Sequence, residues 1–204
     1  MKILNPEIGP RVGLLGELEV ELQLVRAGWH PVRLDTAQMA SNADLLAVNR
    51  KKRVSIQVKA TDTEKQHSHS QFLGFGYSTG YVRDKKPFFN SKRSPLIADV
   101  IIAVSYRSNA SRFVVLPVAL AERLCRAHAD YWSAIPAKKR DDGGKLGQRS
   151  DSFPIFLCFD SSPRTHTRHH ERIKRNLHAF ENRWGVLSEP LDRLHDAKAW
   201  PLLK

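Results

Sequence analysis

Near the start of the chain, apolar residues recur at the spacing of a helix. Four of them follow one another at steps of three or four residues: Leu15, Leu18, Leu22 and Val25. This spacing places them on one face of a helix, which we expect over residues 14–27, ended by Gly28. We expect that apolar face to pack on a sheet.

Three short stretches rich in apolar residues come next and are typical of strands. They cover residues 30–34, 43–48 and 53–60, and a polar turn at residues 49–52 separates the last two. The pattern predicts the order helix, strand, strand, strand, with the second and third strands paired as a hairpin.

The next part of the chain is polar and then becomes apolar again. Residues 61–95 are interrupted by glycines and predict loops with one edge hairpin. Residues 98–106 and 112–118 are expected to be further strands of the same sheet, and Pro117 can open a helix that runs to about Ala127.

The C-terminal part combines a polar segment with two apolar ones. Residues 137–150 have no apolar periodicity and predict a loop, whereas residues 153–159 predict a buried strand. A last helix is indicated by an apolar stripe: Ile173, Leu177, Phe180 and Trp184. The fold class predicted is α/β, a mixed central sheet flanked by helices, in one domain over residues 1–204. Its core would cover about 11–118, with a basic, helical extension over about 119–204.

The charge of the chain indicates a polyanionic partner. There are 33 lysines and arginines against 21 acidic residues, a net charge of +12. Residues 1–48 hold four basic and six acidic side chains, so the whole excess lies after position 48. Two cysteines are too few for a disulfide framework, and no run of about 18 apolar residues indicates a membrane span. We therefore expect a soluble, cytoplasmic protein that binds nucleic acid.

Polar side chains on two of the predicted strands point to chemistry. Gln57 and Lys59 share one face of their strand, and Asp44 opens the strand expected to pair with it. Burying an acid, an amide and a lysine together is costly unless they bind each other or a cation. Mg²⁺ would suit the Asp44 carboxylate, the Gln57 carbonyl oxygen and the backbone carbonyl of Val58. Lys59 could then stabilise charge on a phosphate or hold an attacking water.

Two acidic residues of the first helix add to this group. Glu17 and Glu21 lie one turn apart on one face, where like charges repel. A second cation, or water on the first one, could offset the repulsion, and so could neighbouring arginine or lysine side chains.

Taken together, the segments "GELEVELQLVRAGW", "NADLLAV" and "IQVKAT" resemble the core of the PD-(D/E)XK nuclease superfamily over residues 13–61. The resemblance implies a restriction-endonuclease-like fold and Mg²⁺- or Mn²⁺-dependent hydrolysis of DNA, with Glu17, Asp44, Gln57 and Lys59 as the catalytic residues. Glu17 would support a second ion or the water. Two positions depart from the family pattern: Ala43 replaces a proline, and Gln57 replaces the usual acid. The amide leaves an alternative open, a catalytically inactive protein that binds nucleic acid with the same fold.

Two basic stretches are expected to contact DNA phosphates. The first surrounds the aromatic pair at positions 88 and 89, and the second opens the last helix. Their candidate residues are Arg83, Lys85, Lys86, Lys92 and Arg93, and Arg168, Arg172 and Arg175. The expected partner is DNA rather than RNA, with no membrane. Because nucleases that cut both strands of a duplex are often dimers, a homodimer is a further possibility.

A zinc site is the weaker alternative for the cysteines. Cys125 and His128 have a C-x-x-H spacing, but no second paired spacing follows, and Cys158 lies inside an apolar predicted strand.

Overall fold

The computed structural model describes most of the predicted core. The described residues are 8–34, 43–62, 72–75, 80–83, 86–89, 98–106, 111–134, 155–158 and 168–203.

A five-stranded sheet forms the centre of the fold, in the order β1-β2-β3-β7-β8. Its strands are β1 (His30–Arg33), β2 (Leu45–Val48), β3 (Arg53–Asp62), β7 (Val100–Tyr106) and β8 (Arg112–Pro117). β1, β2 and β3 pair antiparallel, β7 runs parallel to β3, and β8 runs antiparallel to β7. The sheet is therefore mixed, and the predicted α/β class and the β2–β3 hairpin are confirmed.

Four short strands form two small ladders outside this sheet. β4 (Phe72–Phe75) pairs antiparallel with β9 (Ile155–Cys158). β5 (Gly80–Arg83) and β6 (Lys86–Phe89) form a hairpin, as expected between residues 61 and 95, but it is a separate two-stranded sheet rather than an edge of the central one.

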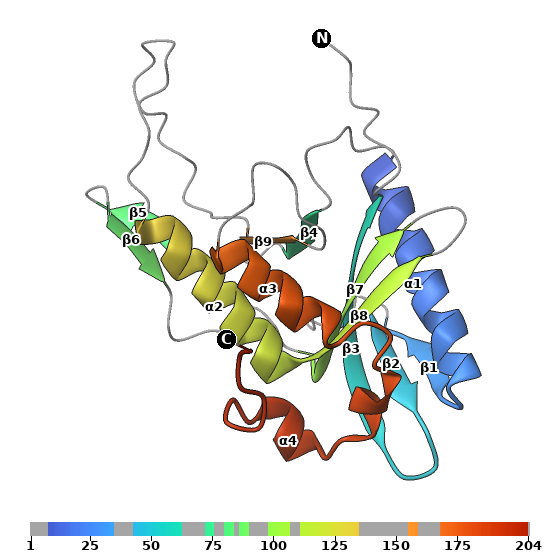
Figure 1. Cartoon of the computed structure of the whole chain (residues 1–204). Coiled ribbons are helices and arrows are strands. Elements are labelled where there is room, and N and C mark those ends of the chain that lie inside the picture. Colours follow the sequence, from blue (N-terminus) through green and yellow to red (C-terminus); the bar gives the residue numbers. More distant parts are fainter. Residues whose placement is uncertain are drawn as a thin grey trace.

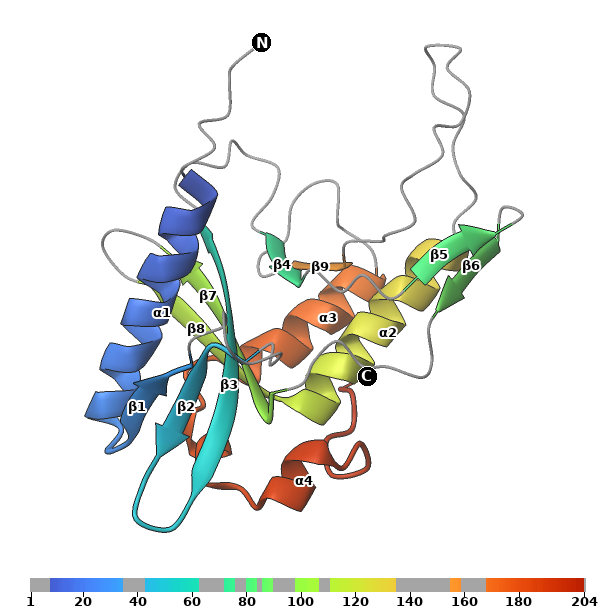
Figure 2. The ribbon, with the colours of Figure 1, turned by 180° about the vertical axis from the view of Figure 1, so that it is seen from behind.

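Helices cover both faces of the central sheet. α1 (Ile8–Arg26) lies along one face, while α2 (Val118–Ala134) and α3 (Arg168–His178) lie on the other (Figures 1 and 2). A 3₁₀ turn, η1 (Trp184–Ser188), and a short helix, α4 (Leu191–His195), follow at the C-terminal end of the chain.

One hydrophobic core joins the sheet to the C-terminal segment. Ile56, Ile101 and Leu116 of the sheet are fully buried, and the same cluster includes Leu194 and Trp200. Hydrogen bonds hold this segment in place as well. The Lys52 ammonium donates to the carbonyls of Leu187 and Glu189, and Arg123 Nη1 donates to the Ala197 carbonyl at 2.5 Å.

The buried face of α1 is not the one that the sequence pattern predicted. Gly16, Val20 and Leu24 face the sheet and are buried. The four residues expected there are 37–59% exposed: Leu15, Leu18, Leu22 and Val25. Both sides of α1 are apolar, and the side that contains Gly16 packs on the sheet because a glycine lets the helix approach β3 closely.

Three helix boundaries also differ from the prediction. α1 begins at Ile8 rather than near position 14, and α2 extends to Ala134 rather than Ala127. α3 ends at His178, so Phe180 lies in the turn after it and Trp184 in η1. Asn182 has a φ of +53°, a left-handed conformation that a continuing helix does not allow.

Among the residues described, no helix combines the length and apolar character needed to cross a membrane. The predicted loop at residues 137–150 lies outside the described residues.

Candidate functional site

The carboxylate of Asp44 is bound to the backbone of β3. Asp44 comes directly before β2, and its backbone N–H donates to the Ile56 carbonyl at 2.8 Å. Its side-chain Oδ2 accepts a 2.6 Å hydrogen bond from the Val58 N–H. Val58 lies between Gln57 and Lys59, so the acid predicted at this strand start does come close to both of those positions.

Gln57 is buried with part of its amide unpaired. The residue is only 6% exposed, and its Oε1 has no hydrogen-bond partner in the described part of the chain. A buried acceptor left without a donor costs about 1–3 kcal/mol, so its presence calls for a reason. A bound ligand that is coordinated by the Gln57 Oε1 would be such a reason.

A glycine brings Glu17 to the same region. A Cβ added at Gly16 would collide with the Ala60 side chain of β3, so only glycine allows α1 to lie this close to the strand. Glu17, the next residue, is thereby held beside the strands that carry Asp44 and Lys59.

The charges of these residues act on one another. Burial raises the pKa of the Glu17 carboxyl, and the nearby Asp44 carboxylate raises it further, against the opposing effect of Arg33 and Lys59. Burial also raises the pKa of Asp44, while the Val58 N–H and the Lys59 ammonium oppose that increase. Two carboxyl groups therefore resist ionisation at the same place, a condition that a bound cation would relieve.

The donor set fits a hard divalent ion. Mg²⁺ and Mn²⁺ prefer carboxylate, amide and backbone carbonyl oxygens, and usually keep several waters. The site offers the Asp44 carboxylate and the unpaired Gln57 Oε1 on neighbouring strands, with Glu17 close by. Asp44, Glu17 and Gln57 thus offer side-chain oxygens, and the nitrogen groups beside them are the Gln57 amide, the Lys59 ammonium, the Arg33 guanidinium and the Val58 N–H. No cluster of three His, Cys, Asp or Glu ligands occurs among the described residues, so such a centre relies on the amide.

The repulsion between Glu17 and Glu21 is offset by an arginine of β1. Arg33 Nε lies 2.6 Å from Glu21 Oε1, and its Nη1 lies 3.4 Å from Glu17 Oε2. A neighbouring basic side chain, one of the alternatives left by the sequence, is thus present at this place. The longer contact leaves Glu17 only weakly engaged.

The basic residues predicted to bind DNA have different outcomes. Arg83 lies on β5 and Lys86 on β6. Lys85, Lys92 and Arg93 lie outside the described residues. Arg168 and Arg175 are exposed on α3. Arg172 is exposed too, but its Nε donates to the Leu203 carbonyl at 3.1 Å and so helps to hold the C-terminal segment.

Asp99 has a role that the sequence did not indicate. Its Oδ2 accepts hydrogen bonds from the N–H and the hydroxyl of Ser55, at 2.8 and 2.7 Å, and its Oδ1 lies 2.8 Å from His195 Nε2. Burial alone would raise its pKa, but the bonds from His195 and Ser55 lower it below the usual value. Asp99 thus joins β3, β7 and α4, two residues along β3 from Gln57. No local signal could have identified partners so distant in sequence.

Cys125 is a poor zinc ligand. It is fully buried in α2, and this burial raises the pKa of its thiol to about 12. Zinc binds the thiolate, which is disfavoured here.

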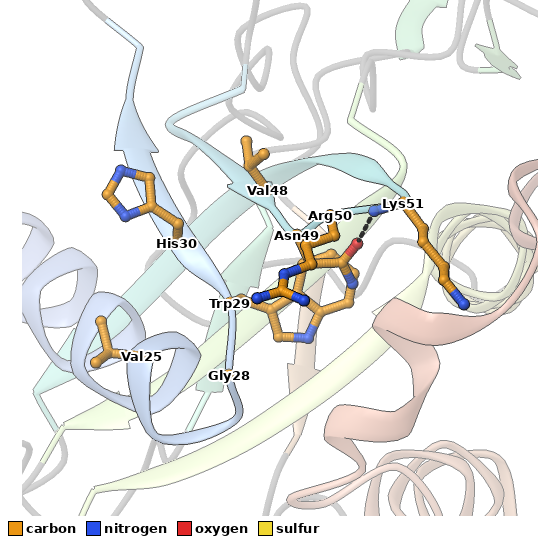
Figure 3. Close-up of a pocket in the computed structure, with 8 residues that line it drawn as sticks. All are labelled: Val25, Gly28, Trp29, His30, Val48, Asn49, Arg50 and Lys51. Carbon is orange, nitrogen blue, oxygen red and sulfur yellow. Dashed lines mark hydrogen bonds between the residues drawn. The ribbon is translucent and has the colours of Figure 1, made fainter.

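A cleft of about 750 Å³ lies at the other end of β2 from Asp44 (Figure 3). It is lined by Val25, Gly28, Trp29, His30, Val48, Asn49, Arg50 and Lys51. Asn49 Oδ1 accepts from the Lys51 N–H at 2.9 Å, which fixes the hairpin turn at its rim. None of the predicted catalytic residues lines this cleft, so it is separate from the Asp44 site.

No protein-family model matches the chain, and no curated protein matches it. Among solved structures, the chain is similar to a bacterial homing endonuclease, I-Ssp6803I, at 12% sequence identity and a TM-score of 0.44. The similarity covers 88% of this chain and 92% of that chain. A likeness this distant carries no argument about function, and the resemblance to the PD-(D/E)XK superfamily stays a prediction.

Proposed function

We propose that this protein is a metal-dependent endonuclease that hydrolyses phosphodiester bonds of DNA. The observation that carries the proposal is the unpaired, buried Gln57 Oε1 next to a carboxylate, Asp44, whose pKa is raised. An arrangement with this cost is expected at a functional site, where a ligand offsets it.

Four groups of the chain would hold the ion, which is Mg²⁺ or Mn²⁺. Asp44 and Gln57 would bind it through side-chain oxygens and Val58 through its backbone carbonyl, while Glu17 would bind a second ion or a water of the first. When bound, such an ion neutralises charge on phosphate oxygens and makes a bound water more acidic.

Lys59 would act on the phosphate and the nucleophile. It follows Gln57 on the same face of β3 and is half-buried. Its ammonium can donate three hydrogen bonds, so it can orient a water for in-line attack and stabilise the charge that develops on the phosphoryl oxygens. Arg33, beside Glu17 and Glu21, limits the negative charge that a phosphate would meet.

The charge of the whole chain favours DNA as the substrate. A net charge of +12 attracts a polyanion, and the exposed Arg168 and Arg175 of α3 are positioned on the surface to contact phosphates.

The test is cleavage of supercoiled, linear and branched DNA by the wild type in Mg²⁺, Mn²⁺ or EDTA. We expect cleavage only with metal, and its loss in Asp44→Asn and Lys59→Ala. Lys51→Ala is the matched control, because it removes the same charge from an exposed turn at the far end of the β2–β3 hairpin. Equal cleavage by Lys59→Ala and Lys51→Ala would refute the assigned role of Lys59.

A second candidate function is favoured by one residue. An amide at position 57 binds Mg²⁺ less strongly than a carboxylate would, which suits a protein that binds nucleic acid without cutting it. Gln57→Glu separates the two: a protein already active should need less metal for half-maximal cleavage in this variant. A wild type that binds DNA but cuts none of the substrates with either metal supports the binding function.

A further inference from the structure

The outer face of α1 is an exposed apolar surface that nothing in the described structure covers. It consists of Leu14, Leu15, Leu18, Leu22 and Val25. These side chains are 37–59% exposed, and together they present on the order of 400 Å² of apolar surface, a size that is often functional on a monomer. The sheet-facing residues Gly16, Val20 and Leu24 lie on the opposite side of the same helix. A helix that is apolar on both sides is expected to be covered on both.

We propose that this outer face binds the outer face of a second copy of the chain, so that the protein is a homodimer joined through α1. Leu15, Leu18, Leu22 and Val25 follow steps of three, four and three residues, the spacing with which two helices pack side by side. A surface with this repeat is complementary to itself, as a two-fold interface requires.

Charge also favours a second copy at this place. α1 carries two basic and three acidic residues, a net charge of −1, in a chain whose total is +12. Two copies therefore meet with less repulsion at α1 than across the basic remainder of their surfaces.

The flanking residues favour an antiparallel pair. Glu19 and Arg26 lie on one flank of the outer face, seven residues apart, and neither has an ion-pair partner among the described residues. An antiparallel copy brings Glu19 of one protomer toward Arg26 of its partner, and opposes the two helix dipoles. A parallel copy would direct Arg26 toward Glu21, which Arg33 already neutralises at 2.6 Å.

The sheet edge next to α1 is a poor alternative for pairing. β1 is the edge strand, and Pro31 in its centre removes a backbone donor. The helix face thus offers the better contact on this side of the molecule.

The first test is the mass in solution by light scattering on a sizing column, in EDTA and without DNA. We expect the wild type at 20–100 μM to elute at about twice its 23.2 kDa, and Leu18→Glu/Leu22→Glu to elute at 23.2 kDa with an unchanged circular dichroism spectrum. A monomeric wild type overturns the proposal, because the face would then belong to another partner. A double variant that stays dimeric and folded overturns it as well.

Cysteine cross-linking decides the matter if the double variant misfolds. In a Cys158→Ser background, with Cys125 fully buried, Leu18→Cys is mixed with Leu22→Cys. An antiparallel pair gives mainly the mixed 18–22 disulfide. A parallel pair gives 22–22 disulfides from Leu22→Cys alone, which would overturn the antiparallel arrangement. If neither the mixture nor Leu22→Cys alone forms a cross-link, the proposed interface is overturned. Neither test uses DNA or metal, so both are independent of the proposed nuclease activity.

Discussion

The unpaired amide of Gln57 makes a prediction about stability that does not depend on any enzyme assay. Gln57→Met replaces the side chain by one of similar length and no branching, in a position that is 6% exposed. If Oε1 has no hydrogen-bond donor in the free protein, removing it should raise the free energy of unfolding by the penalty of the buried acceptor, about 1–3 kcal/mol. We therefore expect the variant to be more stable than the wild type, which is unusual for a buried position.

The magnitude is measurable by thermal unfolding. In a chain of 204 residues, 1 kcal/mol corresponds to about 2–4 °C in Tm. In EDTA the variant should melt at least a few degrees above the wild type. Adding Mg²⁺ should narrow this difference in Tm, because an ion at ten times its Kd stabilises the wild type by about 1.4 kcal/mol and the variant by less.

Two results would refute this reasoning. A variant less stable than the wild type in EDTA would mean that the amide has a partner in the free protein. A variant with the wild-type response to Mg²⁺ would mean that Gln57 is not a ligand. Gln23→Met, the same change on the half-exposed surface of α1, is the control and should alter stability by less than about 0.5 kcal/mol.

Three further predictions concern residues around the site. Asp44→Asn should stabilise the metal-free protein at neutral pH, because the raised pKa of Asp44 means that its ionisation costs folding free energy. The gain in stability should appear as pH rises from below 3.8 through the pKa of Asp44 in the folded state. Urea unfolding across that pH range measures it, and a gain that does not change with pH would contradict the reasoning. Asp99→Ala should cost about 1–3 kcal/mol near neutral pH, since it strands the Ser55 N–H. Because the pKa of Asp99 is lowered, the loss of stability in this variant should shrink as pH falls below 3.8. A loss of stability that persists in acid would mean that the negative charge of Asp99 is not what stabilises the fold. Gly16→Ala should cost about 1–3 kcal/mol by overpacking against Ala60. Gly13→Ala on the same helix meets nothing within 4 Å, so calorimetry should find it neutral or stabilising.

The sequence predicts the sheet better than it predicts the helices. β7 and β8 can be located because they are continuous apolar runs, as expected of strands buried on both faces. β2 can be located because its residues alternate between buried and half-buried. The end of α3 could not be predicted in the same way. Its apolar stripe continues through Phe180 and Trp184, but these residues pack from a turn and from η1 instead.

α1 shows why periodicity alone can choose the wrong face. More of its apolar residues lie on the outer face than on the buried one, and the buried face includes Gly16, which a hydrophobic pattern does not count. What decides the orientation is close approach to Ala60, a contact 44 positions further along the chain. Helix propensity and the spacing of apolar residues do not report how closely a helix can approach a strand.

The candidate site, unlike the orientation of α1, can be predicted from the sequence, because its residues are defined by their local positions on two paired strands. Once residues 44–48 and 53–60 form a hairpin, Asp44 must lie near Gln57, and the Val58 N–H bond to Asp44 is the result. The contribution of Arg33 could not be predicted, since it depends on how β1 approaches α1.

One helix links the two proposals physically. On α1, the buried face fixes the distance to β3, one flank carries Glu17 toward Asp44 and Lys59, and the outer face is proposed to meet a second copy. These three surfaces belong to one rigid element, but it is the buried face, through Gly16 and Ala60, that fixes where Glu17 lies relative to β3. The half-exposed leucines can be replaced without creating a cavity in the monomer, whereas Gly16 cannot accept a methyl group without moving the helix. A dimer-breaking variant should therefore keep its Mg²⁺-dependent rise in Tm, while Gly16→Ala should lose part of it even where the protein stays folded. If instead the Leu18→Glu/Leu22→Glu variant lost the metal response, dimer formation would be part of building the site rather than a separate property of the same helix.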